Sequence, residues 1–468
     1  MPSPRSQPLD LVVRSDRVVT PTGERPAAVG VVGGTIAVIT DRNARLAAID
    51  EVDIGRDALL PGLVDSHVHV NEPGRTHWEG FETATAAAAA GGITTLLDMP
   101  LNALPPTTTA AALDRKRALA RERCAIDVGF WGGAVPGNLG KLSDLVNAGA
   151  FGLKCFLVDS GVPEFPALTP RELAACMREV RALDSLLLVH AEDSSALRPG
   201  VDGPSYADFL ASRPASAEVR AVALVARLAV QLGTRAHIVH LSAADAVPAI
   251  ASARRAGAPL TVETCPHYLT LTAETIPDGA TEFKCCPPIR DARQQEGLWE
   301  ALARGTIDCI VSDHSPCPPA MKHTDTGNFN AAWGGIASLE LTLALVWTQA
   351  QRRGFGLADV ARWMADAPAR IARIPGRGRI AEGYRADLVW FTPRERFTVD
   401  PRRLRQRHAL TPYAGMTLTG LVRRTWLAGS APGPGGGRLL TARAGVPAWP
   451  ATGCQRRLNF DPSVPAEC

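Results

Sequence analysis

The chain contains the stretch Ala58-Leu59-Leu60-Pro61-Gly62-Leu63-Val64-Asp65-Ser66-His67-Val68-His69, an apolar run that ends in two histidines. Successive side chains of a strand point to opposite faces, so His67 and His69 are predicted to point the same way. Two imidazoles side by side at the carboxyl end of a buried strand can bind one metal ion. A single His-x-His pattern also arises by chance, so its meaning depends on what the rest of the chain carries.

Further apolar runs follow the first and alternate with helical patterns. The runs cover residues 58–68, 94–100, 125–133, 150–158, 185–191, 236–241, 259–265 and 306–312. This alternation is typical of repeated βα units. It predicts an α/β protein in which residues 58–378 form a (β/α)8 TIM barrel, a closed ring of parallel strands surrounded by helices. An open doubly wound sheet is the alternative, but no glycine-rich phosphate loop follows the first strand.

Two of the intervening helices have clear end signals. Thr169-Pro170-Arg171-Glu172 is a capping box with proline at the first helical position, and it predicts a helix that reaches about Leu183. Residues 216–232 are rich in Ala, Val and Leu and stop at Gly233, which is typical of a helix C-cap.

The two ends of the chain have a different pattern from the middle. Short β-like runs separated by turn residues occur in residues 9–57 and again in residues 379–430. We expect both segments to contribute strands to one small β-sandwich-like domain beside the barrel. Residues 431–468 begin with a Gly- and Pro-rich stretch and are predicted to be a poorly ordered tail.

Composition excludes several classes of protein. The 468 residues are 46% hydrophobic and 21% charged, which suits a large buried core. The net charge is only +3 and the basic residues are scattered, so neither nucleic acid nor an anionic membrane is expected as a partner. The N-terminus lacks the apolar core of a signal peptide, and no stretch is long and apolar enough to span a bilayer. Ten cysteines without framework spacing indicate reduced thiols, and hence a cytoplasmic protein.

The predicted barrel brings several polar side chains to one face. The runs at 150–158, 185–191, 236–241 and 306–312 contain or are followed by Lys154, His190, His240 and Asp313, in that order. Active sites of such barrels lie at the carboxyl ends of the strands, where these positions converge. Each residue alone also fits a structural role, as a backbone-bonded histidine, a capping aspartate or a snorkelling lysine. Their joint occurrence at equivalent positions favours a functional site.

Lys154 lies inside an apolar run, where burial disfavours its charged form. With a pKa of about 10.4 in water, well under about one lysine in a thousand is neutral at pH 7. A buried neutral amine near two dications could react with carbon dioxide to give a carbamate, N6-carboxylysine, whose two oxygens can bridge two metal ions.

The resulting hypothesis is a binuclear metal site. One ion is held by His67 and His69 and the other by His190 and His240, with carboxylated Lys154 between them. Asp313 completes the ligand set of the first ion. Such a mixture of nitrogen and oxygen ligands suits two zinc ions, although manganese, cobalt or iron also remain open.

A pair of metal ions about 3.5–4 Å apart generates a bridging hydroxide near neutral pH and polarises a carbonyl group. Asp313 could take the proton from the hydroxide and pass it to a departing nitrogen, acting first as base and then as acid. The implied reaction is hydrolysis of an amide-like C–N bond.

Several strings within residues 10–430 resemble the cyclic amidohydrolases, a family that includes dihydroorotase, hydantoinase, dihydropyrimidinase and allantoinase. The strings that most resemble the allantoinase branch are residues 67–81, 98–102, 152–157, 263–269, 283–290, 312–317 and 332–336. By this resemblance the carboxylated lysine is Lys154, and the metal ligands are His67, His69, His190, His240 and Asp313. The resemblance also implies a homotetramer.

Substrate chemistry separates the branches of this family. Dihydroorotases typically place Arg two residues after the second histidine of the motif, whereas this chain has Asn71, which offers a substrate carboxylate no bidentate partner. Hydantoinases lack the continuation through residues 72–81. Allantoin is a neutral hydantoin ring with a ureido arm, and it requires amide-like hydrogen bonds. The candidates for these bonds are Asn102 and the backbone groups around Cys286 and Gly335. Several relatives have serine at the position of Cys286.

The resemblance therefore predicts an allantoinase, which opens the hydantoin ring of allantoin to give allantoate in purine breakdown. A dihydroorotase or a hydantoinase/dihydropyrimidinase is the near alternative. A catalytically inactive scaffold homologue is the distant alternative, and it is disfavoured because inactive copies usually lose ligands that are all present here.

Overall fold

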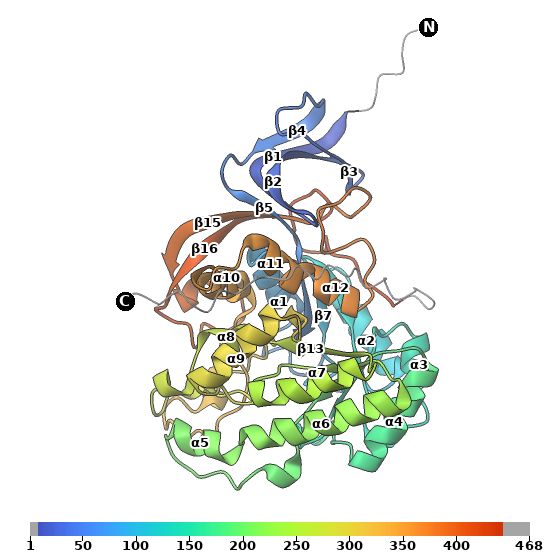
Figure 1. Ribbon diagram of the computed structural model, residues 1–468, viewed down its shortest axis with the longest axis vertical. Coiled ribbons are helices and arrows are strands. Elements are labelled where there is room, and N and C mark those ends of the chain that lie inside the picture. Colours follow the sequence, from blue (N-terminus) through green and yellow to red (C-terminus); the bar gives the residue numbers. More distant parts are fainter. Residues whose placement is uncertain (1–7, 443–468) are drawn as a thin grey trace.

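Strands from both ends of the chain form one seven-stranded sheet in the computed structural model, which describes residues 8–442 (Figure 1). The strand order is β16-β15-β5-β1-β2-β3, and β4 also pairs with β1. These strands are β1 (Leu9–Thr20), β2 (Gly23–Val32), β3 (Thr35–Thr40), β4 (Ala48–Asp53), β5 (Ala58–Pro61), β15 (Leu388–Thr398) and β16 (Thr417–Trp426). Strand β5 joins the two parts, because it runs parallel to β1 and antiparallel to β15.

The predicted first strand of the barrel is two strands in the structure. Strand β5 ends at Pro61 and belongs to the seven-stranded sheet, whereas β6 (Leu63–Val68) begins the barrel. The break lies at Gly62, where an added Cβ would stand 2.3 Å from the hydroxyl oxygen of Thr94. The apolar run is continuous because both strands are fully buried.

Parallel strands form the barrel below this sheet (Figure 1). After β6 they are β7 (Ile93–Asp98), β8 (Asp127–Phe130), β9 (Gly132–Gly133), β10 (Leu153–Phe156), β11 (Leu187–His190), β12 (Ala236–Ile238), β13 (Leu260–Thr264) and β14 (Cys309–Ile310). The predicted run 125–133 contains both β8 and β9, which are separated by Trp131. A bridge between Val68 and His314 joins the end of the last strand to β6 and closes the ring. The predicted TIM barrel is confirmed.

Side chains of the barrel strands alternate between an outer and an inner core, as the period of two requires. In β11, Leu187 and Val189 pack in the cluster that contains helix residues such as Met177. Leu188 between them packs in a second cluster with Val64 from another strand of the barrel. The position of a residue along its strand therefore decides whether its side chain enters the barrel interior.

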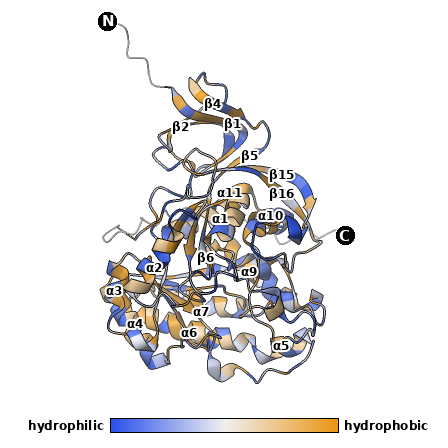
Figure 2. Ribbon diagram, turned by 180° about the vertical axis from the view of Figure 1, so that it is seen from behind, coloured by the Kyte–Doolittle hydropathy of each residue, from blue (hydrophilic) through white to orange (hydrophobic). Residues whose placement is uncertain are grey.

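Helices cover the outside of the barrel (Figure 1). They are α1 (Phe81–Ala90), α2 (Ala110–Ala120), α3 (Leu142–Asn147), α4 (Pro170–Ala182), α5 (Tyr206–Ser212), α6 (Ala215–Leu232), α7 (Val247–Arg255), α8 (Pro266–Thr270) and α9 (Ala292–Ala303). The capping box at Thr169 and the left-handed C-cap at Gly233 (φ 65°) confirm the two predicted helix ends. Hydrophobic and hydrophilic residues alternate along these helices in Figure 2, since one face of each packs on the barrel.

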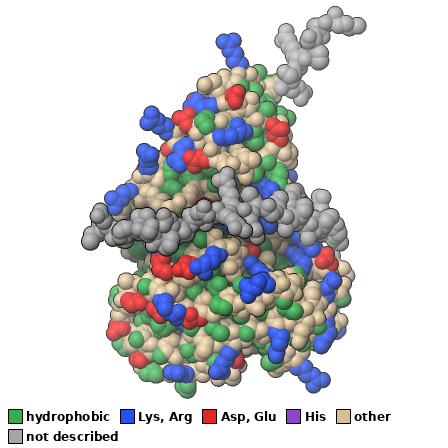
Figure 3. Space-filling view, in the orientation of Figure 1, with side chains coloured by type: hydrophobic (Ala, Val, Ile, Leu, Met, Phe, Trp, Pro, Cys, Tyr) green, Lys and Arg blue, Asp and Glu red, His purple; other side chains and the backbone are tan. Residues whose placement is uncertain are grey.

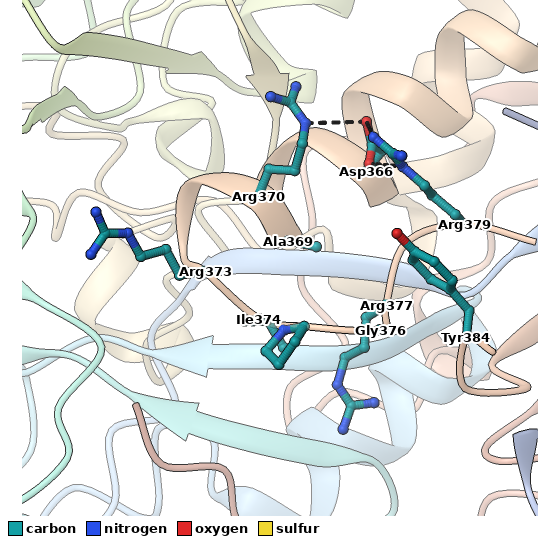
Figure 4. A pocket seen from close by; sticks show the side chains of 10 residues that line it. Asp366, Ala369, Arg370, Arg373, Ile374, Gly376, Arg377, Arg379 and Tyr384 are labelled. Carbon is teal, nitrogen blue, oxygen red and sulfur yellow. Dashed lines mark hydrogen bonds and ion pairs between the residues drawn. The ribbon is translucent and has the colours of Figure 1, made fainter. Parts of the chain in front are cut away.

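Helices α10 (Thr342–Arg352), α11 (Leu357–Ala361) and α12 (Ala367–Ile371) connect the barrel to the seven-stranded sheet. Helix α10 packs on β16, and α11 packs on β1, β2 and β5. Beside α12, Asp366 accepts hydrogen bonds from Arg370 and from Arg379 around a small cavity of about 40 Å³ (Figure 4). These ion pairs tie the helix to the segment that leads into β15.

Part of the predicted tail lies along the barrel. The N–H of Val128 in β8 donates to Arg438 O at 2.9 Å, and the N–H of Leu440 donates to Val128 O at 2.7 Å. An added Cβ at Gly437 would stand 1.9 Å from Ile126 O, so this glycine permits close approach to the barrel. Residues 437–440 are therefore not part of a poorly ordered tail as predicted, and residues 443–468 lie outside the described residues.

Charged side chains are scattered among hydrophobic and other groups on the face shown in Figure 3. Within residues 8–442, no helix combines the length and apolar character needed to cross a membrane.

Candidate active site

One cavity of about 540 Å³ opens at the carboxyl ends of the barrel strands. Its lining includes every residue that the sequence predicted for the site, namely His67, His69, Asn102, Lys154, His190, His240, Cys286, Asp313 and Gly335. These residues come from segments far apart in the chain, and the closed barrel brings them together.

The histidines and Asp313 form one compact group. His67 lies in β6, His190 ends β11, and His240 and Asp313 follow β12 and β14. The Nε2 atoms of His67 and His69 lie 3.2 Å and 3.5 Å from Oδ1 of Asp313. The ring centroids of His190 and His240 are 4.6 Å apart. One ligand atom each from His67, His240 and Asp313 lies within 4.8 Å of the others, which suits the binding of a metal ion.

His240 and Asp313 have left-handed backbones, with φ of 40° and 44°. Such conformations cost non-glycine residues on the order of 1 kcal/mol or more, and they persist where the surroundings fix them. Both residues directly border the cavity, so the strain is located at the group that could hold a metal.

Several buried polar atoms at this group form no hydrogen bond within the described part of the chain. They are Nε2 of His67, Nζ of Lys154 and Nδ1 of His240. A buried polar atom left without a hydrogen bond costs about 1–3 kcal/mol. A metal centre would satisfy the two histidine nitrogens directly, so the donor set fits the metal site that the sequence predicted.

Lys154 faces the barrel interior from β10. Its neighbours Leu153 and Cys155 pack in the outer core, so the alternation of the strand directs Lys154 inward. Its side chain is fully buried, and its ammonium group lies 5.2 Å from the ring centroid of Phe156. Burial lowers the pKa of Lys154 to about 8. At pH 7 roughly one molecule in ten then has a neutral amine, which is the form that can react with carbon dioxide.

Two buried glutamates orient the histidines from behind. Glu263 contacts Nδ1 of His67, pairs with Nε2 of His237 at 2.8 Å, and accepts from the N–H of His240 at 3.2 Å. Burial opposes the ionisation of Glu263, but His67 and His237 bring its pKa below the usual range. Carboxylates behind ligand histidines fix the ring orientation and tautomer.

Glu192 plays the corresponding part for another histidine. Its carboxylate lies 2.7 Å from Nε2 of His190 and accepts from Arg213 at 2.6 Å. Neither Glu263 nor Glu192 was predicted from the sequence as part of the site. A signal was present, because Glu263 is a carboxylate inside a predicted buried strand and Glu192 follows His190 by two residues.

The buried histidines are disposed to be neutral. Burial lowers the pKa of His190, and burial together with neighbouring positive groups lowers the pKa of His69 and His240 well below the ordinary range. Neutral imidazole is the form that binds metal ions.

His314, the neighbour of Asp313, serves the structure of the last strand end. Its Nδ1 accepts from the N–H groups of Ser338 and Leu339 at 3.2 Å and 3.3 Å, so its Nε2 donates to Glu79 at 2.9 Å. All hydrogen-bonding positions of the ring are used, which leaves no free nitrogen for a ligand.

The candidates for substrate contact lie on the cavity wall, whereas Asn71 does not. Asn71 donates to Pro316 O at 3.3 Å, and its side-chain oxygen accepts from Asn102 at 3.4 Å. Gly335 has φ of 150°, and an added Cβ there would stand 2.0 Å from Ser315 O, so only glycine fits this part of the wall.

Known proteins resemble this chain over most of its length. The allantoinase of Streptomyces avermitilis is 55% identical over 424 residues, which cover 90% of this chain and 95% of that protein. The allantoinase of Saccharomyces cerevisiae is 46% identical, covering 79% of this chain and 82% of that protein. Among solved structures, L-hydantoinase (dihydropyrimidinase) from Arthrobacter aurescens matches with a TM-score of 0.87 and 30% identity, covering 92% of this chain and all of that chain.

The family model described as "Amidohydrolase family" matches residues 58–431, which include the whole barrel and every residue of the candidate site. Together with the extent of the similarity to the curated relatives, this match shows that the chain belongs to the amidohydrolase family.

Proposed function

We propose that the protein is an allantoinase, which hydrolyses a ring amide C–N bond of allantoin and releases allantoate. The 55% identity to the Streptomyces avermitilis allantoinase, over 90% of this chain, carries the choice of substrate. The cavity supports the choice of reaction, because it gathers histidines, a buried lysine and a buried aspartate at the carboxyl ends of a barrel.

We propose that the residues of this cavity hold two divalent metal ions, with zinc preferred for its nitrogen-rich ligands. His67, His69 and Asp313 would hold one ion, His190 and His240 the other, and Lys154 both, as N6-carboxylysine. When bound, the two ions supply Lewis-acid polarisation of the substrate carbonyl and lower the pKa of a water molecule.

Asp313 acts as the proton carrier of the reaction. Its carboxylate borders the cavity, and burial raises its pKa, which favours accepting a proton. Asp313 takes one proton from the attacking water as the new C–O bond forms at the ring carbonyl. It then gives this proton to the ring nitrogen as the C–N bond breaks. The product has an NH2 group at the former ring nitrogen and a carboxylic acid at the former carbonyl carbon, which ionises to the carboxylate by losing the second proton of the water to solvent.

The cations on the cavity wall favour a neutral ring over a carboxylate substrate. Arg213 gives two of its nitrogens to Glu192, and Lys284 gives its ammonium group to backbone carbonyls. The position that offers arginine to the substrate in dihydroorotases is Asn71, which bonds to neighbouring loops instead. A dihydroorotate carboxylate would therefore lack the bidentate partner that it requires.

Hydantoinase activity is the second candidate, because the solved structures that match this chain include hydantoinases with TM-scores up to 0.87. The test compares initial rates of the purified, zinc-loaded protein on allantoin, dihydroorotate and a 5-substituted hydantoin. The proposal predicts the fastest turnover with allantoin. Faster turnover of the simple hydantoin would make the protein a hydantoinase, and a preference for dihydroorotate would refute the argument from Asn71.

We also propose a homotetrameric assembly, as the resemblance to cyclic amidohydrolases implies, which analytical ultracentrifugation would measure. The eight cysteines among the described residues are all free, which suits the proposed cytoplasmic location. Cell fractionation would check that location.

A further inference from the structure

Two buried lysines, Lys284 on one wall of the cavity and Lys322 beneath it, donate only to backbone carbonyls. The ammonium group of Lys284 donates to Asn330 O at 3.0 Å and to Ala332 O at 2.6 Å. The ammonium group of Lys322 donates to Lys284 O at 3.0 Å and to Gly335 O at 2.6 Å. The two lysines thus connect the segments 284–286 and 330–335, which both line the cavity.

Further backbone hydrogen bonds complete this wall. The N–H of Gly335 donates to Lys284 O at 2.8 Å, and the N–H of Trp333 donates to Met321 O at 2.8 Å. Lys284 O therefore accepts from both Gly335 and Lys322. Because the N–H of Gly335 is already used, a backbone N–H that donates to the substrate on this wall must come from a neighbouring residue.

The neighbouring backbone amides are free to bind a ligand. Among the described residues, the N–H groups of Cys286 and Gly334 donate to no protein group. Both residues line the cavity, and an added Cβ on Gly334 would lie 3.5 Å from the Cys286 sulfur, so the two residues are adjacent. Two neighbouring N–H donors suit the carbonyl oxygens of a neutral cyclic ureide, which accept hydrogen bonds and carry no charge.

Both ammonium groups are buried without a carboxylate partner among the described residues. Lys284 and Lys322 are 8% and 4% exposed, and neither forms an ion pair with a carboxylate among the described residues. Placing an ammonium group in such surroundings is costly unless its donors are used. An apolar side chain of similar length would fill the same space but would leave the four carbonyl contacts unmade.

We propose that Lys284 and Lys322 are positioning residues, which hold the N–H groups of Cys286 and Gly334 where they donate to the carbonyl oxygens of the ring substrate. This inference rests on the proposed function for the identity of the ring. It assigns the lysines to substrate binding, and it leaves metal binding and proton transfer to the other residues of the cavity.

The first test is the variant Lys322→Met, which keeps the length of the side chain and removes its donors. The expected result is a KM for allantoin at least 10-fold higher, with kcat changed less than 3-fold and the bound metal unchanged. Lys322→Arg should restore most of the KM, because it restores a charged donor. Lys141→Met, on an exposed lysine outside the cavity lining, is the matched control and should match the wild type.

Lys284→Met and the double variant test whether the two lysines stabilise the same part of the cavity wall. Lys322 donates to the backbone carbonyl of Lys284, and both lysines donate to carbonyls of the segment 330–335. Because the two lysines connect the same two segments, the double variant should raise KM by less than the product of the two single effects. An unchanged KM in both single variants would overturn the proposal. A fall in kcat with KM unchanged would overturn it as well, since it would show an effect on the chemical step.

Hydrogen exchange tests the same claim without any lysine variant. In the metal-loaded Asp313→Asn protein saturated with allantoin, the peptides covering residues 283–290 and 330–336 should become protected. Unchanged exchange in both peptides, with allantoin shown to be bound, would overturn the proposal. If the wild type hydrolyses another cyclic ureide and not allantoin, the proposed function fails, and the same measurements with that ureide still decide the role of the lysines.

Discussion

His67 and Glu263 are in direct contact, through Nδ1 of the imidazole and a carboxylate oxygen, at the centre of the barrel. The other ring nitrogen of His67 lies 3.2 Å from Asp313, so one histidine links the buried glutamate to the cavity. Both side chains are fully buried, and Glu263 also accepts from the N–H of His240. One carboxylate thereby orients residues from two different strands of the proposed metal site.

We predict that Glu263→Gln weakens metal binding about 10- to 100-fold, the usual cost of losing a carboxylate behind a ligand histidine. Glutamine keeps the volume, but its amide presents an NH2 group to one of the donors that Glu263 now satisfies. Metal content measured after dialysis against a series of metal buffers checks the prediction. Glu300→Gln is the control, because Glu300 pairs with Arg304 at an exposed position. Equal metal affinity in the two variants would contradict the role given to Glu263.

We predict that Lys154→Ala loses both the bound metal and the activity. The reason is that the alanine side chain cannot supply the two bridging oxygens that the proposed carbamate provides. Short carboxylic acids added in excess should restore part of the activity, because their carboxylate can occupy the space left by the side chain. Metal content and the allantoin hydrolysis rate, with and without acetate, are the measurements. Full activity of Lys154→Ala without added acid would exclude the carbamate.

The barrel could be predicted because its signal is repeated. Each βα unit carries an apolar run and a helix, and the end signals at Thr169 and Gly233 are local. The break at Gly62 could not be predicted from the run itself, because both strands on either side are buried and apolar. Gly62 passes so close to Thr94 of the next strand that a Cβ at this position would collide with it, and only the three-dimensional arrangement reveals this close approach.

The candidate site was predictable for the same reason, since its residues stand at equivalent strand ends. The residues behind it were not, because Glu263 gains its role from contacts with His67 and His237, which are distant in the sequence. The prediction of a poorly ordered tail after residue 430 was wrong for residues 437–440, which pack on the barrel. Gly437 permits close packing on Ile126 where the composition indicated disorder.

We predict that Asp313→Asn lowers kcat for allantoin about 10²- to 10⁴-fold at saturating zinc, which is the usual contribution of a proton carrier. Asparagine retains an oxygen that can contact a metal ion, but it cannot accept the proton of the attacking water. Steady-state kinetics with the bound metal quantified in parallel is the measurement. A kcat within 10-fold of the wild-type value would assign the proton transfer to another group.

We predict that Lys116→Met destabilises the fold by about 3–5 kcal/mol at pH 8, the usual cost of leaving a buried charge without its partner. Lys116 lies 2.7 Å from Asp98, and both side chains are buried. Burial raises the pKa of Asp98 above its ordinary value of 3.8, and loss of Lys116 raises it further.

The pH dependence of this loss follows from the sign of that shift. A carboxyl group whose pKa is higher in the folded state binds a proton more readily there, so the fold loses stability as the pH rises through that pKa. The loss of folding stability in Lys116→Met, relative to the wild type, should therefore become smaller as the pH falls from 8 to 5. Urea unfolding across this range measures it, and the double variant Lys116→Met with Asp98→Asn should recover much of the stability. A deficit that does not vary with pH would contradict the assignment.

The metal centre is tested most directly by anomalous X-ray diffraction from crystals of the zinc-loaded protein. We expect two zinc peaks, one beside His67, His69 and Asp313 and one beside His190 and His240. Density extending from Nζ of Lys154 should lie between the two peaks. A single peak, an unmodified Lys154, or zinc located instead at the buried group of His237, Glu263 and Cys309 would contradict it.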